Sequence, residues 1–274
     1  MTRGLLFLVL ASFLAGPVFA QGGPPLLTTD PDTPGPQTLE LNIGVLPVLR
    51  HDNSSGGPGK GPVQVSNVQA PQFDLNYGIG ERIQLTYEVP FVWQSVPNQP
   101  NVTGWSNGFV GVKWRFYEQS EDGWKVSVFP QLQTDGPDGA VGKGIAETGV
   151  RMLLPVEISR KVGPVRVNFE AGYYIPIRSP HTHYERFFGL AFSHEFTRRF
   201  EAIGEVFNDY VLGDQPKDTV FDAGFRYTMH RSFILLFMAG RSFSSNNSGQ
   251  PYFLSYAGVQ ILLDRNGRSF HVEH

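Results

Sequence analysis

Residues 149–176 read GVRMLLPVEISRKVGPVRVNFEAGYYIP, and this stretch decides the fold. Apolar and polar residues alternate along two runs that flank a short turn at residues 160–164. In the first run Val150 falls on one face, while Arg151 and Glu157 fall on the other. Successive side chains of a strand point to opposite faces, so the pattern predicts a β-hairpin with one apolar and one polar face. Each run has about ten residues, the length of a tilted strand that crosses a bilayer.

Most of the chain repeats this unit. Strand-like runs are predicted at 38–48, 69–77, 82–93, 108–117, 124–134, 148–159, 165–176, 186–196, 200–207, 219–227, 233–241 and 252–263. Short connections alternate with long ones rich in Gly, Pro, Asn, Ser and Asp, as in outer-membrane barrels with short periplasmic turns and long external loops. We therefore expect an all-β fold, a transmembrane antiparallel up-and-down β-barrel of about 12 strands over residues 38–263.

Two arrangements of the apolar face are conceivable, inward as in a soluble barrel or sandwich, or outward to lipid. The outward arrangement is favoured because a barrel of about twelve strands is too wide for side chains to fill an apolar interior readily. Aromatic residues also gather near both strand ends, as in the belts at membrane interfaces. They are Tyr77, Trp114, Phe116, Trp124 and Tyr227 by the turns, and Trp93, Trp105, Tyr173, Tyr184, Phe187 and Tyr252 by the loops.

The polar face supplies the residues expected to line the lumen. These are Glu88, Lys113, Arg115, Arg151, Glu157, Arg166, Glu170, Glu201, Glu205, Asp222, Arg226 and Gln260. Most basic members lie on strands of one direction and most acidic members on strands of the other, which predicts cross-strand ion pairs. Two roles remain open, a charged constriction that selects solutes and a structural ladder that holds the barrel rigid.

Six prolines fall within the predicted strands, although a closed barrel has no edge strand to shelter them. We expect bulges or early ends of pairing near these residues. They are Pro47, Pro71, Pro90, Pro130, Pro155 and Pro176.

The ends of the chain read as processing and connecting segments. Residues 1–20 have the basic start, apolar run and small-residue cleavage site of a signal peptide. Residues 21–37 are Pro-rich and are expected to form an extended periplasmic tether, and residues 264–274 a periplasmic tail. The expected location is the outer membrane of a Gram-negative bacterium, with lipid, the barrel-assembly machinery and a small solute as partners.

Composition narrows the function further. The formal net charge of −3 gives no argument for nucleic acid, and the absence of cysteine removes disulfide scaffolds and thiolate metal sites. No cofactor is expected. The mean hydropathy of −0.18 is compatible with a membrane barrel, because every second residue faces the interior.

Sites for metals, phosphate or hydrolysis are weakly indicated. His181, His183 and Glu185 could bind a metal, but they read better as a solvated loop. Residues 135–139 lack the calcium-loop pattern, and residues 139–144 lack the phosphate-loop pattern. The chain is not expected to be an enzyme, because it has no G-x-S-x-G motif and no His–Ser pair suited to a lipase. A loop-sited hydrolase, such as a surface protease that uses either His51 and Asp52 or His181 and Asp214, stays an alternative.

Several hairpins carry a resemblance to a known family. Residues 74–85, 108–116, 155–176 and 202–205 resemble the bacterial outer-membrane family labelled "MetA-pathway of phenol degradation", over residues 30–263. The resemblance implies an outer-membrane transporter without catalytic residues. We therefore expect passive passage of small molecules, hydrophobic or aromatic ones by resemblance. A non-conducting barrel that acts in adhesion or as a scaffold through its external loops is the other class of function.

Overall fold

The structure, a computed structural model, describes residues 24–52, 63–178, 184–211, 216–243 and 250–263. The predicted signal peptide and C-terminal tail lie outside these residues. The strands are β1 (Leu39–Asp52), β2 (Val63–Ile79), β3 (Ile83–Ser95), β4 (Val102–Trp105), β5 (Phe109–Glu118), β6 (Lys125–Val128), β7 (Gln131–Gln133), β8 (Val150–Val162), β9 (Val165–Arg178), β10 (Glu185–Thr197), β11 (Phe200–Val211), β12 (Pro216–His230), β13 (Phe233–Ser242) and β14 (Pro251–Leu263).

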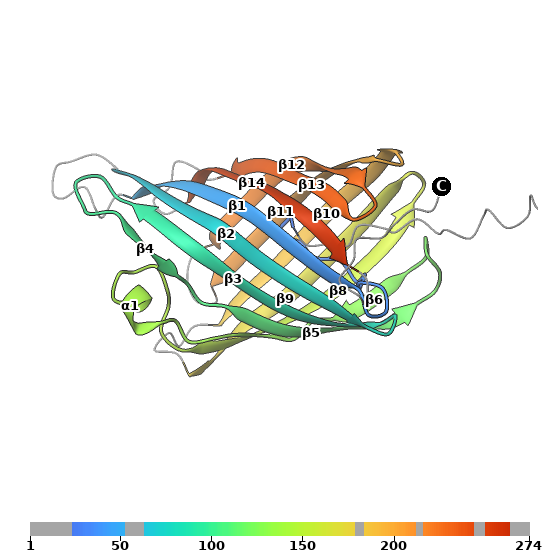
Figure 1. Cartoon of the computed structure of the whole chain (residues 1–274), viewed down its shortest axis with the longest axis horizontal. Coiled ribbons are helices and arrows are strands. Elements are labelled where there is room, and N and C mark those ends of the chain that lie inside the picture. Colours follow the sequence, from blue (N-terminus) through green and yellow to red (C-terminus); the bar gives the residue numbers. More distant parts are fainter. Residues whose placement is uncertain (1–23, 53–62, 179–183, 212–215, 244–249, 264–274) are drawn as a thin grey trace, which may run out of the picture.

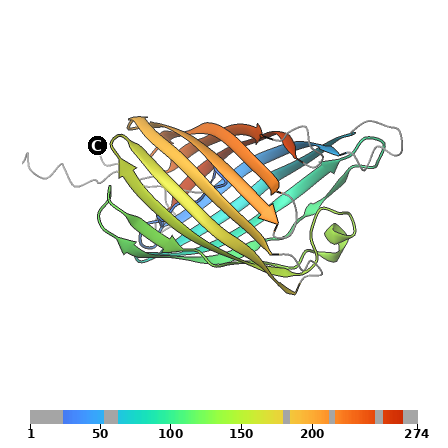
Figure 2. The same cartoon turned by 180° about the vertical axis from the view of Figure 1, so that it is seen from behind.

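These elements form one closed antiparallel barrel (Figures 1 and 2). Each long strand pairs with its neighbours in the sequence, and β1 closes the ring by pairing with β14 from Leu39↔Leu263 to Arg50↔Pro251. β4 and β5 pair with successive parts of β3, and β6 and β7 pair with successive parts of β8. Each of these two pairs is one interrupted strand, so the wall has the twelve strands that the sequence predicts.

Several strands are longer than the sequence pattern indicates. β1 and β2 pair as far as Asp52↔Val63, well into residues 49–68, which the sequence analysis assigns to a connection. The hairpin continues because antiparallel pairing needs only backbone groups, and those of this polar stretch still pair. Side-chain composition therefore underestimates the height of the wall.

The prolines lie where pairing is irregular, as predicted. Register shifts occur between Gly44 and Leu46, beside Pro47, and between Gln69 and Gln72, around Pro71. Pro90 is the partner of Gln72 at the edge of the second shift.

Pro155 and Pro130 share one explanation. The strand formed by β6 and β7 is interrupted at residues 129–130, opposite Pro155. The carbonyl of Pro155 accepts a hydrogen bond from the Phe129 N–H over 3.1 Å. Pro155 has no N–H of its own to donate, so it is accommodated where the neighbouring strand is broken.

The apolar face points outward and the charged face inward. Val112 and Phe169 are 43% and 40% exposed, whereas Glu170 is 3% exposed. Apolar side chains on the outer surface of a ring cannot form a central core. The predicted outward orientation is therefore confirmed, and the soluble barrel with an apolar centre is not observed.

One predicted belt residue is placed differently. Phe187 is 4% exposed and packs between the rings of Tyr174 and Phe207, with centroid distances of 5.4 and 5.9 Å. Its β9 partner is Gly172, where an added Cβ would lie 2.7 Å from the Phe187 ring. The missing side chain makes room for the ring inside the wall, so Phe187 does not belong to the outer belt.

Part of the interior is apolar. The inward side chains of β13 and β14 form a buried cluster with residues of β1 and β12. Its members are Val48, Val220, Ile234, Leu236, Met238, Leu254, Tyr256 and Leu262. The polar side chains therefore concentrate on the rest of the wall.

A short helix, α1 (Asp138–Val141), lies beside β4 at the long-loop end (Figure 1). Ala140 and Ile145 pack on Val92 of β3, and Ser106 donates to the Ile145 carbonyl over 2.7 Å. This loop thus covers the interruption between β4 and β5. Among the described residues, no helix reaches the length and hydropathy needed to span a bilayer.

Candidate functional site: the filled lumen

The most informative contacts of the lumen are made by residues 24–38, which precede β1. The Pro-rich composition of residues 21–37 predicts an extended periplasmic tether. Its residues instead bond to side chains on β5, β6, β8, β9 and β11, which places them inside the ring. We call residues 24–38 the N-terminal segment. Pro-rich composition predicts extended backbone, but it carries no information about what the backbone contacts.

Three glutamates hold the middle of the N-terminal segment. The Glu205 carboxylate accepts the N–H groups of Leu27 and Thr28 over 2.6 and 2.7 Å. The Glu170 carboxylate accepts the Thr29 N–H over 2.8 Å, and the Thr29 hydroxyl donates to Glu157. Hydrogen bonds to an ionised acceptor are about twice as strong as neutral ones. Leu27, Thr28 and Thr29 are thereby held through their backbone N–H groups, which any residue except proline would also provide.

Cationic side chains hold the part nearer to β1. The Asp32 carboxylate pairs with Arg115 at 2.8 Å and with Lys125 at 2.6 Å. The Lys113 ammonium donates to the backbone carbonyl of Asp30. Burial, to which the nearby Asp32 carboxylate adds, raises the pKa of Asp30 to about 6. Charge complementarity with the wall therefore fixes the segment at this level.

Glycines of the wall shape the seat of the N-terminal segment. A Cβ added to Gly189 of β10 would lie 2.1 Å from Thr28 Oγ1, and one added to Gly78 would lie 2.2 Å from the Gly35 carbonyl. Gly78 also exchanges backbone hydrogen bonds with Gln37 and Thr38. Gly189 and Gly78 thus allow close approach of a second backbone.

The predicted lumen residues fall into four groups. Lys113, Arg115, Glu157, Glu170 and Glu205 contact the N-terminal segment directly. Asp222 is the cross-strand partner of Glu205, Arg226 pairs with Glu201 at 3.4 Å, and Gln260 hydrogen-bonds Glu40. Glu88 and Arg151 lie toward the long loops, where Arg151 pairs with Glu147 and Glu185. Arg166 pairs with Asp122 at the turn end.

The expected ladder of opposite charges forms only in part. Arg226 faces Glu201 as predicted, and Lys113 pairs with Glu157 at 3.2 Å. Other rows put like charges side by side, namely Glu157↔Glu170, Glu205↔Asp222 and Asp74↔Glu88. Adjacent carboxylates repel each other unless donors are shared between them. The N-terminal segment supplies such donors to Glu157, Glu170 and Glu205.

A second polar group of the lumen is not among the predicted residues. Glu40 and Asn42 of β1 meet Asp74 and Asn76 of β2, and each asparagine amide lies 3.0–3.3 Å from both carboxylates. All four are at most 7% exposed. They alternate with apolar residues in the sequence, so the period-two pattern would have identified them. They leave two carboxylates together, with no cation of the described residues within ion-pair distance.

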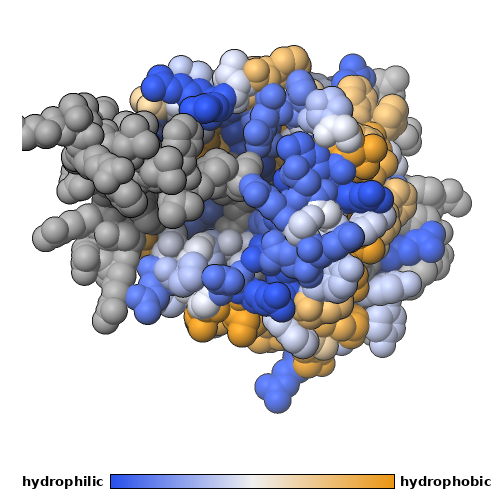
Figure 3. All heavy atoms as spheres, turned by 90° about the vertical axis from the view of Figure 1, so that its right-hand side faces the viewer, coloured by the Kyte–Doolittle hydropathy of each residue, from blue (hydrophilic) through white to orange (hydrophobic). Residues whose placement is uncertain are grey.

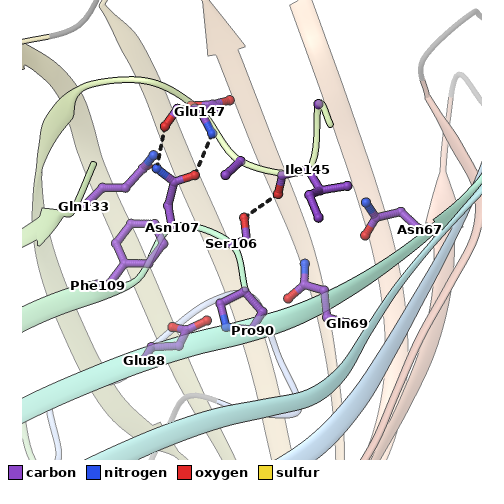
Figure 4. Close-up of a pocket in the computed structure, with 12 residues that line it drawn as sticks. Asn67, Gln69, Glu88, Pro90, Ser106, Asn107, Phe109, Gln133, Ile145 and Glu147 are labelled. Carbon is purple, nitrogen blue, oxygen red and sulfur yellow. Dashed lines mark hydrogen bonds between the residues drawn. The ribbon is translucent and has the colours of Figure 1, made fainter. Parts of the chain in front are cut away.

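A cavity of about 330 Å³ lies above the segment, on the long-loop side. Glu88 and Gln133 line it, together with the loop that follows α1 (Figure 4). Asn107 fixes this loop, because its amide donates to the carbonyls of Thr134 and Glu147 over 2.9 and 2.8 Å. The cavity is therefore built against a well-anchored loop.

The opposite end has a polar centre. Figure 3 views the barrel from the end with the short turns, where hydrophilic residues gather centrally and hydrophobic residues lie toward the sides. A water-compatible centre and an apolar flank are consistent with the inward and outward faces of the strands.

The weaker candidate sites gain no support. The described residues contain no group of three or more His, Asp or Glu residues placed to hold a metal ion. His181, His183 and Asp214, named for the metal and hydrolase alternatives, lie outside the described residues. His51 stacks on Tyr252 with ring centroids 4.5 Å apart.

Comparison with known proteins supports the fold. No family model matches the chain, and no curated protein matches its sequence. A solved outer membrane channel of the COG4313 group from Pseudomonas putida F1 is similar in structure, with a TM-score of 0.62 and 11% identity over 85% of this chain and 98% of that one. The translocator domain of the autotransporter NalP from Neisseria meningitidis is also similar, with a TM-score of 0.52 and 10% identity over 84% and 89%. The chain therefore has the fold of solved outer-membrane β-barrels, and at this identity the likeness concerns the fold.

Proposed function

We propose that this protein spans the outer membrane of a Gram-negative bacterium and passes small molecules through its lumen, with the N-terminal segment as a removable plug. The observation that carries the proposal is the chemistry of the filled lumen. The segment is held mainly by hydrogen bonds and ion pairs, as between Asp32 and Arg115, which water can replace. A continuous apolar core could not open in this way without exposing hydrocarbon to water.

The outer surface supports the membrane location. Exposed apolar side chains such as Val112, Phe169 and Leu235 cover a ring far larger than the patches that soluble monomers expose. Trp93 and Trp114, toward opposite ends of the barrel, are 52% and 51% exposed, as expected for interfacial aromatics. The predicted signal peptide would direct export, and the barrel-assembly machinery would insert the strands.

The family label and the kind of solute belong to the same proposal. We infer a relationship to the family labelled "MetA-pathway of phenol degradation", on the hairpins quoted above and the twelve-stranded architecture. The hydrophobic or aromatic solutes that this resemblance implies stay a prediction. The apolar inner cluster around Met238 is compatible with such solutes, because it makes part of the inner wall apolar.

The filled lumen also favours the alternative of a non-conducting barrel that acts through its external loops. Liposome swelling with small sugars and amino acids separates the two functions. We expect slow swelling with the parent protein and faster swelling with Thr28→Pro, which removes the N–H bonded to Glu205. Thr28→Val keeps this N–H and is the matched control. If neither protein swells liposomes above the empty-vesicle rate, transport is refuted.

A further inference from the structure

A row of carboxylates crosses one side of the lumen at the level of the N-terminal segment. We call Glu157, Glu170, Glu205 and Asp222 the carboxylate belt. Glu157 pairs with Glu170 across β8 and β9, and Glu205 pairs with Asp222 across β11 and β12. The strand between them, β10, contributes Gly189 opposite Glu170 and thus no bulk. Neighbouring strands lie about 4.8 Å apart, so the belt spans roughly 19 Å of wall.

Glu170 and Glu205 of the belt are occupied by backbone N–H groups, whereas Glu157 binds Lys113 and two hydroxyl groups. Glu205 and Glu170 accept three consecutive backbone N–H groups of the N-terminal segment. Carboxylates that accept N–H donors will also accept the donors of an ammonium or guanidinium group, which add a full positive charge. The seat of the segment is therefore chemically a seat for cationic nitrogen.

One member of the belt is not needed for holding the segment. Asp222 is 5% exposed, and neither of its carboxylate oxygens accepts a hydrogen bond from a described residue. It lies against Glu205 and interacts with it electrostatically. If the belt only anchored the segment, a small apolar residue at this position would avoid a buried carboxylate without a donor.

The described part of the lumen has more carboxylates than cationic side chains to pair with them. Lys113, Arg115, Lys125, Arg151 and Arg226 each lie within 4.0 Å of a carboxylate. Six inward carboxylates face no cation at that distance among the described residues, namely Glu40, Asp74, Glu88, Glu170, Glu205 and Asp222. A narrow passage with an excess of one sign of charge concentrates counter-ions, by about tenfold or more where that excess is large. Rings of Asp and Glu are a common basis of cation selectivity.

We propose that the carboxylate belt is the selectivity site of the open barrel and binds solutes with positively charged amino groups, in competition with the N-terminal segment. The inference rests on the proposed function, because selectivity requires a lumen that opens. It names the solute class by charge and donor chemistry. Binding to the belt would also favour the undocked segment, since both use Glu170 and Glu205.

The first test measures ion selectivity in planar bilayers. The full-length Thr28→Pro variant is used because its segment is loosened, and Thr28→Val is the control because the Thr28 hydroxyl has no hydrogen-bond partner among the described residues. In a tenfold KCl gradient, the reversal potential of Thr28→Pro should give a potassium-to-chloride permeability ratio of about ten or more. Adding E170Q/E205Q/D222N should bring the ratio toward one. Adding E121Q, which neutralises an exposed turn residue, should leave it unchanged. An anion-selective or unselective Thr28→Pro channel would overturn the inference.

The second test measures binding and does not require conduction. Spermidine is titrated calorimetrically into the detergent-folded Thr28→Pro protein. Its affinity should be at least about tenfold higher than for the variant that also carries E170Q/E205Q/D222N, because each charge-assisted hydrogen bond contributes substantially. Heat-modifiable migration on gels confirms that both variants are folded. Equal affinities would overturn the belt assignment, whereas tight binding without any current would refute the transport function alone.

Discussion

Replacing Gly189 with alanine is expected to loosen the docking of the N-terminal segment in the barrel. The new Cβ would lie 2.1 Å from Oγ1 and 3.0 Å from Cβ of Thr28, where ordinary contacts begin at 3.4 Å. Rotating the threonine side chain relieves only the first overlap. The segment must therefore move at Thr28, and the two N–H groups that bond to Glu205 move with it.

The size of the effect follows from these two hydrogen bonds. They measure 2.6 and 2.7 Å, and the remaining overlap of about 0.4 Å lengthens them to about 3.0–3.1 Å, which weakens both without breaking them. A hydrogen bond to a charged group contributes about 1.5–3 kcal/mol, so weakening both destabilises docking by on the order of 1–2 kcal/mol. Each 1.4 kcal/mol is a factor of ten, which shifts the docking equilibrium by about tenfold.

Hydrogen exchange of the peptide that contains Leu27 and Thr28 measures this shift directly. Exchange in Gly189→Ala should be faster by up to the same factor, and single-channel current should rise in parallel. The matched variant is the double substitution G189A/T28G, which removes both threonine atoms that clash. Its exchange rate should return toward that of the parent, which a general destabilisation of β10 would not allow.

Two results would refute the reasoning. One is an unchanged exchange rate in Gly189→Ala with the barrel intact. The other is a double variant whose segment stays as exposed as in Gly189→Ala, because the clash would then not be the cause.

Three further outcomes are expected. Asp32→Asn removes the carboxylate shared by Arg115 and Lys125 and should weaken docking by on the order of 2 kcal/mol. The measurement is faster hydrogen exchange of residues 27–29, and unchanged exchange would contradict the role of these ion pairs. Phe169→Lys puts a charge on the outer face and should lower the free energy of unfolding of the inserted barrel by about 2–4 kcal/mol, measured by urea unfolding from lipid vesicles. A decrease in this free energy of less than about 1 kcal/mol would indicate that the outer face does not contact hydrocarbon. The pKa of Asp30 is raised to about 6 by burial and by Asp32, against the opposing effect of Lys113 and Arg226. Its contribution to docking is therefore present at acidic pH and is lost as pH rises through about 6. Single-channel current should then be larger at about pH 8 than at about pH 5. Asp30→Asn should remove this component of the pH dependence, and an identical pH profile in the variant would count against it.

The wall of the barrel could be predicted from the sequence because its information is local. Phe169 and Glu170 are neighbours in the chain, and alternation alone puts one outward and the other inward. The prolines likewise indicate irregular pairing, because a proline lacks the N–H donor and this affects the strand pairing at that residue. Only the cause at Pro155 required the structure, since the broken strand opposite it lies more than twenty residues earlier.

The contents of the lumen could not be predicted because they depend on long-range contacts. Thr28 meets Glu205 across a sequence separation of 177 residues, and nothing in a Pro-rich composition indicates that partner. The same holds for the like-charged pair Glu205 and Asp222, which appears unfavourable until a third chain segment supplies donors. Phe187 was misplaced for a related reason, because its inward position depends on the room left by Gly172 on another strand.

The position of the plug in the chain has a consequence for biogenesis. Thr38 is followed directly by β1, and β1 forms the last seam of the barrel with β14. The N-terminal segment is therefore joined directly to the strand that closes the barrel. If the N-terminal segment acts as the proposed plug, a newly assembled barrel would already be closed, and passage of solutes would require the segment to leave its seat.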